Sequence, residues 1–248
     1  MAMHPTPHNS DQDWMQRALM LAREVRGHVY PNPPVGCVIV KDGDVVAEAA
    51  THPGGRPHAE RKALDMAGFL AKGATLYVTL EPCCHWGQTP PCSDAIIDAG
   101  IARVVCAVQD PDPRVNGGGF AALLGAGIDL KTGVCRDEAK AVLSGFLHRI
   151  QFGAPEIIES AESPGLIPQG ADAVLASGTQ EVVLTTRTGT IKGELRSQDQ
   201  LLYWMAELGL TTVAIPQQDA FWTQDQIRQT SSDCDNGSTA KLQLLNGR

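Results

Sequence analysis

Two short segments of this chain must meet in space, and that requirement limits its possible folds more than any other feature. The first segment is His58-Ala59-Glu60, and the second contains Cys83 and Cys92. Together they supply an imidazole, two thiols and a carboxylate, the side chains of a hydrolytic zinc site with three protein ligands and an open fourth position. The gap between the segments can hold one helix and one strand. The sequence therefore predicts that a helix start and a strand end meet at one metal.

Each of these residues suits a separate task. Neutral imidazole nitrogen and thiolate sulfur are preferred zinc ligands, so we expect His58, Cys83 and Cys92 to bind one Zn²⁺ per chain. Glu60 follows the ligand His58 closely, and we expect it to act as the catalytic acid and base without binding the metal. Cys84 competes with Cys83 as a ligand; we favour Cys83 because it directly follows a proline that fixes the turn. Cysteine pairs are often small core residues, but the order of all four groups favours a metal site.

Apolar periodicity predicts helices and strands around this site. Asp42-Gly43 indicates a hairpin between the first two strands, and the later strands alternate with helices. This order predicts an α/β fold with three α/β/α layers and a mixed five-stranded sheet. His58 and Cys92 then stand at helix starts, where the helix dipole favours a thiolate. The expected helices span 14–25, 58–71, 92–99, 119–124 and 136–150, and the expected strands span 35–40, 45–50, 75–80, 103–108 and 128–132.

The pattern of predicted helices and strands changes near residue 150, which predicts two domains, 1–150 and 151–248. Beyond this point, strands are expected at 182–186 and 211–215. A helix capped by Ser197 is expected at 197–208 between them, giving a β-α-β fragment. Residues 224–248 are polar, and we expect this tail to be mobile.

Charge and composition exclude some classes of partner. The net charge of −8 argues against nucleic acid, whose binding needs a basic surface. No apolar run approaches the length of a membrane span, and residues 1–13 lack an apolar signal region. Seven cysteines, an odd number, are typical of a reducing compartment rather than a disulfide framework. We therefore expect a cytoplasmic protein that contacts neither nucleic acid nor membrane.

Four motifs resemble one known family. They are Pro31-Asn32-Pro33-Pro34-Val35-Gly36, Gly54-Gly55-Arg56-Pro57-His58-Ala59-Glu60, Thr79-Leu80-Glu81-Pro82-Cys83-Cys84-His85 and Thr89-Pro90-Pro91-Cys92. These segments are similar to the deaminase half of the bifunctional riboflavin-biosynthesis deaminase–reductase, a branch of the cytidine-deaminase-like superfamily. The resemblance covers a little over half of the chain. It implies a cytidine-deaminase-like fold and a small-molecule substrate, a pyrimidine nucleotide.

The resemblance also implies a reaction and its participants. The expected reaction is zinc-dependent hydrolytic deamination of 2,5-diamino-6-ribosylamino-4(3H)-pyrimidinone 5′-phosphate, with Glu60 passing a proton from water to a ring nitrogen and then to the leaving amine. Asn32, His52, His85 and Thr89 are the implied substrate-binding residues. The alternatives are that Asn32 is an ordinary turn asparagine and that His52 is a solvated loop residue.

One position departs from the family pattern in a way that bears on phosphate. The family often has Arg where this chain has Gln88. Losing a guanidinium removes a bidentate phosphate donor. Arg56 and Lys41 are the candidates to replace it.

The second domain resembles a reductase that has lost parts. Residues 201–215 resemble a helix and strand that precede Glu-Gly-Gly in the family, but Pro216-Gln217-Gln218 follows them here. Glycine allows backbone to approach a phosphate closely, and glutamine does not replace it. We therefore interpret 151–248 as a truncated, degenerate reductase-like region and do not expect NADPH as a cofactor. The resemblance further implies a homo-oligomer, dimer or tetramer.

Two other functions stay open. One is a zinc deaminase acting on another small nucleobase or nucleotide. The other is a non-catalytic zinc module that binds a partner protein. A purely structural zinc site normally closes with a fourth ligand, and the presence of Glu60 favours an enzyme.

Overall fold

The chain forms two compact units, Met1–Leu143 and Ser144–Arg248. A computed structural model describes residues 10–222, except 88, 163–164, 179–180, 195–196, 218 and 220. The division falls inside helix α5 (Arg136–Phe152), shortly before the expected boundary at residue 150. The predicted mobile tail, 224–248, lies outside the described residues.

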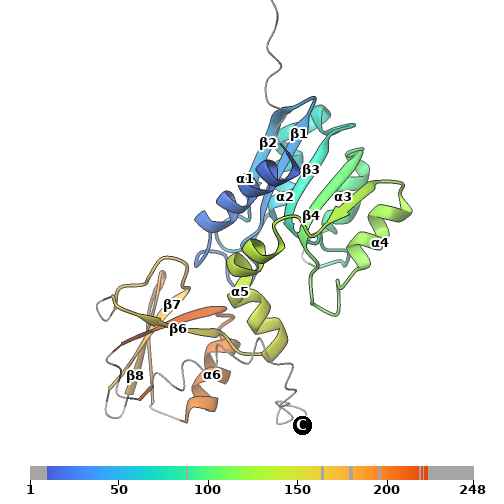
Figure 1. The fold of residues 1–248 in the computed structure, drawn as a ribbon. Coiled ribbons are helices and arrows are strands. Elements are labelled where there is room, and N and C mark those ends of the chain that lie inside the picture. Colours follow the sequence, from blue (N-terminus) through green and yellow to red (C-terminus); the bar gives the residue numbers. More distant parts are fainter. Residues whose placement is uncertain are drawn as a thin grey trace, which may run out of the picture. The chain divides into compact units, whose positions relative to one another are not determined.

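The first unit contains the helices and strands that the periodicity predicts (Figure 1). The predicted helix from 58 to 71 ends as an α-helix at Ala67, because Gly68 takes a φ of 53°, and a short 3₁₀ turn, Gly68–Ala71, completes it. The elements are α1 (Asp11–Glu24), β1 (Gly36–Lys41), β2 (Asp44–Ala50), α2 (Ala59–Ala67), β3 (Thr75–Leu80), α3 (Cys92–Asp98), β4 (Arg103–Val108), α4 (Gly118–Gly125), β5 (Asp129–Thr132) and α5.

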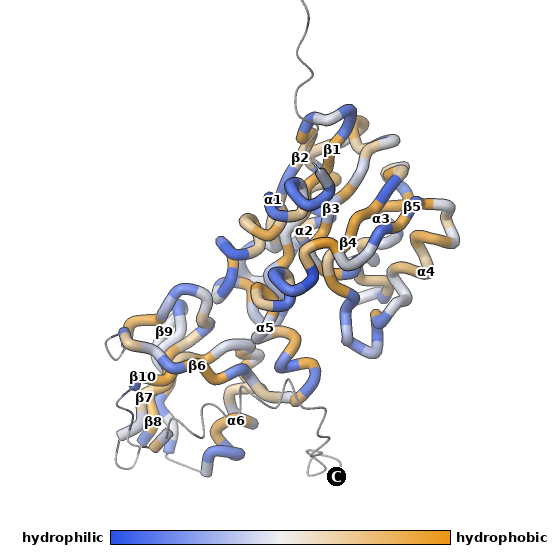
Figure 2. The backbone as a smooth tube through the Cα atoms, viewed as in Figure 1, coloured by the Kyte–Doolittle hydropathy of each residue, from blue (hydrophilic) through white to orange (hydrophobic). Residues whose placement is uncertain are grey.

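These strands make one mixed sheet in the order β2-β1-β3-β4-β5, which confirms the predicted sheet. Strand β1 is antiparallel to β2 and β3, whereas β3, β4 and β5 run parallel. Helix α1 packs against β1 and β3, while α2, α3 and α4 contact one another in sequence on the other face (Figure 1). With both faces covered, the central strands are apolar and almost fully buried (Figure 2).

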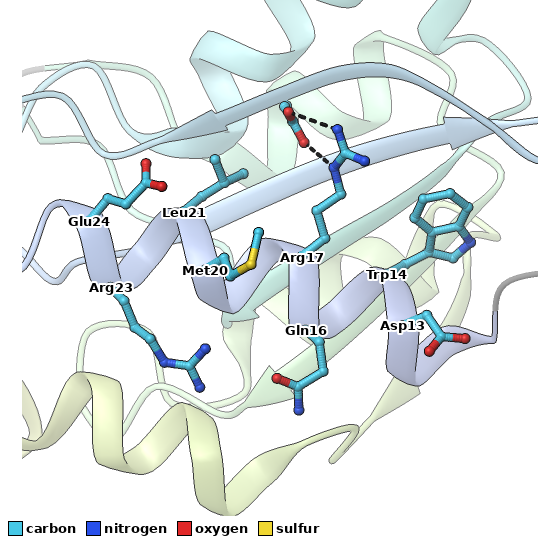
Figure 3. Close-up of a pocket in the computed structure, with 9 residues that line it drawn as sticks. Asp13, Trp14, Gln16, Arg17, Met20, Leu21, Arg23 and Glu24 are labelled. Atoms are coloured by element: carbon cyan, nitrogen blue, oxygen red, sulfur yellow. Dashed lines mark hydrogen bonds and ion pairs between the residues drawn. The ribbon is translucent and has the colours of Figure 1, made fainter.

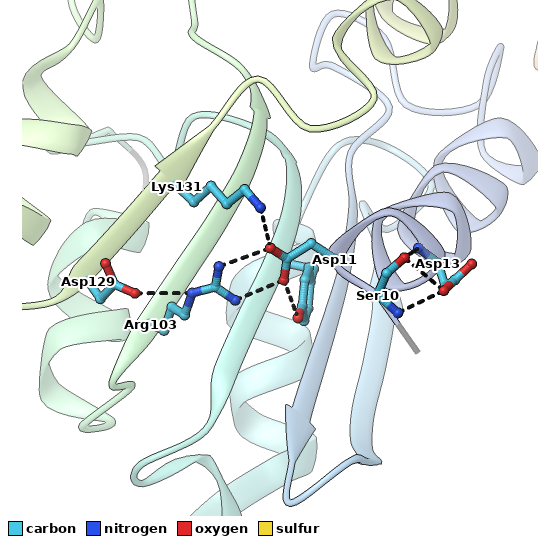
Figure 4. Close-up of polar contacts among 7 residues, drawn as sticks. Ser10, Asp11, Asp13, Arg103, Asp129 and Lys131 are labelled. Carbon is cyan, nitrogen blue, oxygen red and sulfur yellow. Dashed lines mark hydrogen bonds and ion pairs between the residues drawn. The ribbon is translucent and has the colours of Figure 1, made fainter. Parts of the chain in front are cut away.

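The start of α1 is fixed to the sheet by one half-buried carboxylate (Figure 4). Asp11 accepts two hydrogen bonds from the Arg103 guanidinium, at 2.8 and 2.9 Å. It also accepts from Lys131 Nζ at 2.7 Å and from the Tyr77 hydroxyl at 3.0 Å. The hydrogen bond from Arg103 is the main reason that the pKa of Asp11 lies well below its usual range. This network joins α1 to β3, β4 and β5.

Local signals also begin and seat this helix. Ser10 and Asp13 form a capping box at its first turn, as Figure 4 shows. Further along, Gly36 of β1 lies so close to the carbonyl of Ala18 that a Cβ there would overlap it. The missing side chain lets the helix approach the sheet.

The second unit has a five-stranded sheet of its own, in the order β6-β10-β7-β8-β9. Strands β6, β10 and β7 are parallel, and β8 and β9 extend the sheet antiparallel. The helix cap at Ser197 is confirmed, because its hydroxyl accepts the Gln200 N–H at 3.4 Å. The elements are β6 (Glu156–Ser160), β7 (Ala173–Ser177), β8 (Glu181–Thr186), β9 (Gly189–Glu194), α6 (Gln198–Glu207) and β10 (Thr212–Pro216).

The predicted β-α-β fragment was therefore incomplete, since β6, β7 and β9 had no counterpart in it. Strand β9, with the sequence GTIKGE, is almost entirely exposed and has two glycines, so it lacks an apolar alternation. Strand β7 reads AVLAS and contains two alanines, which are weak strand formers. Within the described parts of the chain, no helix is long and apolar enough to cross a membrane.

Candidate metal centre

Three chain segments converge at the edge of the first sheet where the parallel strands end. His58 is the residue directly before α2, Cys83 follows β3, and Cys92 is the first residue of α3. His58 and Pro91 are the N-cap residues of α2 and α3, and both have extended backbone, so each helix begins at the next residue. A helix that follows a strand in an α/β sheet begins at the carboxyl end of that strand. The meeting of these helix starts at one edge therefore follows from the topology.

The three side chains present their ligand atoms to one point. His58 Nδ1 lies 3.7 Å from Cys83 Sγ and 3.4 Å from Cys92 Sγ, and the three ligand atoms lie within 4.8 Å of one another. Tetrahedral zinc with Zn–S near 2.3 Å and Zn–N near 2.0 Å would place neighbouring ligand atoms about 3.5–3.8 Å apart. The nitrogen–sulfur spacings therefore fit a single zinc ion with three protein ligands.

The surroundings of Cys83 favour its thiolate. Its sulfur accepts the backbone N–H of Cys92 at 3.3 Å. Hydrogen bonding from the Cys92 side chain, followed by that from His58, lowers the pKa of Cys83 to about 4. The neighbouring Cys84 is turned elsewhere, with its sulfur 3.6 Å from the carbonyl oxygen of Arg114. Of the two adjacent cysteines, only Cys83 lies in the cluster.

Glu60 is a buried carboxyl group next to this cluster. It is the second residue of α2 and only 4% exposed. Burial raises its pKa to about 6, although the charge of His58 acts in the opposite direction. A carboxyl group with a pKa near neutrality can both accept and return a proton during turnover.

The loop that carries Cys83 is braced by Glu81, a residue to which the sequence motifs assign no separate role. Its carboxylate accepts backbone N–H groups from Asp110 at 3.2 Å and from Gly117 and Gly119 at 3.0 Å. A further bond comes from the N–H of Phe120 at 3.2 Å. Three of these donors belong to the start of α4, whose free N–H groups need acceptors. Glu81 thus joins the end of β3 to α4.

The predicted substrate-binding residues lie on loops at the same edge. Asn32 is half-buried, and its side chain lies against Gly55, where a Cβ would overlap the amide. His52 is exposed, with Nδ1 2.7 Å from the carbonyl oxygen of Pro53. His85 is half-buried, and its Nδ1 is buried without a hydrogen-bond partner among the described residues.

Thr89, the fourth of these residues, is exposed and contacts an arginine. Its hydroxyl oxygen accepts a hydrogen bond from Arg56 Nη1 at 2.9 Å. A hydrogen bond with Cys83 raises the pKa of His58, and the nearby Arg56 charge opposes that effect. Arg56 therefore stands close to the metal centre, whereas Gln88 lies outside the described residues.

A surface hollow elsewhere on this unit does not coincide with the site. It is lined by Glu48 of β2 and by eight residues of α1, among them Arg17, which forms an ion pair with Glu48 (Figure 3). Its lining includes no histidine or cysteine. Side chains for hydrolysis gather instead at the His58–Cys83–Cys92 cluster.

Comparison with known families identifies the same region. The model of the cytidine and deoxycytidylate deaminase zinc-binding region matches residues 8–108, which include the whole cluster. The riboflavin biosynthesis protein RibD of Escherichia coli (strain K12) is 55% identical over 147 residues, covering 59% of this chain and 40% of that protein. RibD of Aquifex aeolicus is 50% identical over 147 residues, covering 59% and 41%. The chain spans about two fifths of the length of these curated relatives.

Solved structures resemble more of the chain. Form 2 of RibD from Acinetobacter baumannii matches with a TM-score of 0.67 and 30% identity, covering 83% of this chain and 79% of that one. A diaminohydroxyphosphoribosylaminopyrimidine deaminase/5-amino-6-(5-phosphoribosylamino)uracil reductase from Thermotoga maritima matches with a TM-score of 0.68 and 26% identity, covering 85% and 82%. These shares exceed the first unit, so the likeness extends into the second.

Proposed function

The chain belongs to the RibD family of riboflavin biosynthesis proteins, and from this premise we propose that it catalyses one step of that pathway. The proposed reaction is hydrolytic deamination of 2,5-diamino-6-ribosylamino-4(3H)-pyrimidinone 5′-phosphate, which yields 5-amino-6-ribosylaminouracil 5′-phosphate and ammonia. The observation that carries the proposal is the convergence of His58, Cys83 and Cys92 beside the buried Glu60.

In this proposal His58 Nδ1 and the sulfurs of Cys83 and Cys92 hold one zinc ion. Bound zinc would lower the pKa of water, so that a nucleophile forms near neutral pH. Glu60 takes the proton of the attacking water and delivers it to the ring nitrogen next to the amine-bearing carbon. It then takes the remaining proton of the added hydroxyl group and gives it to the departing amine, which leaves as ammonia as the carbonyl group forms. Burial suits Glu60 to this work because it raises the pKa of the carboxyl group towards neutrality.

The surrounding loops would position the substrate. We assign Asn32 to the ribose or base, because its amide lies against Gly55, on the loop that leads to His58. His85 is a candidate base contact, since it has a buried ring nitrogen with no hydrogen-bond partner in the described part of the chain. His52 and Thr89 are exposed on the flanking loops. His52 would contact the substrate, and Thr89 would contact its phosphate.

We further propose that the second unit does not reduce the product with NADPH. The support is sequence: after β10, the chain continues through Gln217 and Gln218 where the family pattern has glycines. A separate reductase would then be required for the next step.

A panel of substrates tests the proposed reaction. Zinc-loaded protein is incubated with the diaminopyrimidine ribotide, cytidine, deoxycytidylate and guanine, and ammonia release is followed for each. We expect the ribotide to have the highest kcat/KM by at least about 100-fold, because buried polar groups reject a ligand that leaves them unpaired. A higher kcat/KM for any other compound would replace the proposed substrate with that compound.

A further inference from the structure

The side chain of Arg56 bridges two loops beside the metal centre. Arg56 precedes His58 on the loop before α2, whereas Thr89 and Gly87 lie on the loop that leads to α3. Arg56 Nη1 donates to Thr89 Oγ1 at 2.9 Å, and Nη2 lies 3.6 Å from the position that a Cβ would take at Gly87, an ordinary van der Waals distance. The guanidinium therefore connects the two loops next to the cluster.

Among the described residues, no carboxylate neutralises the charge of this guanidinium. Arg17, Arg103 and Arg114 each form an ion pair with a carboxylate. For Arg56, by contrast, no carboxylate among residues 10–222 that are described lies within 4.0 Å. The residue is half-buried, so water screens its charge less than on an open surface. An unpaired cation of this kind attracts an anionic ligand.

The hydrogen bond between the two residues leaves suitable donors for an anion. Because the Thr89 oxygen accepts from Arg56, its own hydroxyl proton is available to donate. Arg56 keeps its remaining N–H groups, which can bind two oxygens of one phosphate in a fork. The pair thus offers a charged donor and a hydroxyl donor side by side.

We propose that Arg56 and Thr89 form the subsite for the phosphate monoester of the substrate. This inference rests on the proposed function, because it assigns a role to the phosphate of that ribotide. It also explains how the chain tolerates Gln88 where the family often has Arg: the guanidinium comes from the opposite loop.

Lys41, the other candidate, is in the wrong place. It ends β1, and because β1 is antiparallel to β3, that end lies beside the start of β3, with Val40 opposite Thr75. The metal ligand Cys83 follows the other end of β3. The Lys41 ammonium also donates to the carbonyl of Lys72 at 2.8 Å. Lys41 therefore lies at the opposite edge of the sheet from the metal centre.

Binding of a phosphate probe tests the subsite without requiring turnover. Ribose 5-phosphate and ribose are titrated calorimetrically into zinc-loaded wild type, Arg56→Gln and the control Arg61→Gln. Arg61 is an exposed arginine of α2 that pairs with Asp65, so the control removes the same charge from the same region. Zinc content and Tm are measured for each variant to establish equal folding.

We expect ribose 5-phosphate to bind wild type and Arg61→Gln alike, and to bind Arg56→Gln about 10- to 100-fold more weakly, the loss typical of a charge-assisted hydrogen bond. Thr89→Ala should weaken binding by a smaller factor, and ribose should not distinguish the proteins. Equal affinity of wild type and Arg56→Gln, or no preference of wild type for ribose 5-phosphate over ribose, would overturn the proposal.

Kinetics provide a second readout. With the ribotide, Arg56→Gln should raise KM and leave kcat near the wild-type value, whereas kcat/KM for the dephosphorylated nucleoside should not change. An equal loss on both compounds would mean that Arg56 acts on the metal centre or the fold, which contradicts the subsite. If wild type released no ammonia, the proposed reaction would fail, and the ribose 5-phosphate titration would still decide the subsite.

Discussion

Glu60 is a carboxyl group that can accept a proton only when ionised, and this gives the reaction a predictable dependence on pH. Burial raises its pKa to about 6, so the group becomes protonated as pH falls through that value. We expect kcat/KM to be constant at neutral pH and to fall on the acidic side of about 6. Zinc adds positive charge nearby and shifts this limit to lower pH.

The pH profile of kcat/KM, measured with zinc content at each pH, checks this expectation. The residual activity of Glu60→Gln should show no acidic limb, because an amide does not titrate. A wild-type rate that falls only where zinc is lost would show that metal release, not Glu60, controls the profile.

At the same scale, the residues of the cluster could be predicted, but the contact between Arg56 and Thr89 could not. Order and spacing in the sequence were enough to select His58, Cys83 and Cys92, and the structure brings them together. Cys83 was favoured over Cys84 because it follows a proline, and the structure places Cys83 in the cluster and the Cys84 sulfur near the carbonyl oxygen of Arg114. The sequence places Arg56 close to His58 but gives no sign of its hydrogen bond to Thr89, which depends on how the two loops fold.

Among the elements, the connection between β3 and α4 depends on the Glu81 carboxylate. Replacing Glu81 by Gln keeps its shape but puts an NH₂ group opposite backbone N–H donors. We expect Glu81→Gln to lower the free energy of unfolding by about 2–3 kcal/mol, because buried donors lose a charged acceptor. Urea unfolding of zinc-loaded protein measures this, with the exposed Glu24→Gln as control. A change below about 0.5 kcal/mol, as for a surface site, would contradict the brace.

The elements of the first unit were predictable because their apolar periodicity is strong and both faces of the sheet are covered. The second unit was less predictable. Its edge strand β9 is exposed and glycine-containing, so its strand conformation comes from pairing with β8 rather than from local sequence.

For the whole molecule, the metal would join three segments that are distant in sequence. Zinc at His58, Cys83 and Cys92 would connect the starts of α2 and α3 to the end of β3. Ligand binding stabilises the folded state by about 4 kcal/mol when the ligand is present at 1,000 times its Kd. We therefore expect chelation to lower the Tm by roughly 10 °C. Circular dichroism on heating measures it; zinc but not magnesium should restore the Tm, and an unchanged Tm after complete zinc removal would contradict this role.

The second unit makes a separate prediction. NADPH should show no saturable binding to the whole chain, since Gln217 and Gln218 stand where glycines would allow close backbone approach to a phosphate. Fluorescence titration of NADPH measures this directly. Saturable binding, or NADPH oxidation in the presence of the deaminated product, would show a working reductase.

The central claim is that Glu60 and a three-ligand zinc site deaminate the pyrimidine ribotide. Its most direct test is ammonia release from that ribotide by zinc-loaded wild type and Glu60→Gln, with zinc measured in both. We predict one zinc per chain in each protein, turnover by wild type, and a loss of at least about 10²–10⁴-fold in the variant. Equal turnover by the two proteins would contradict the role of Glu60, and no turnover by zinc-loaded wild type would contradict the reaction itself.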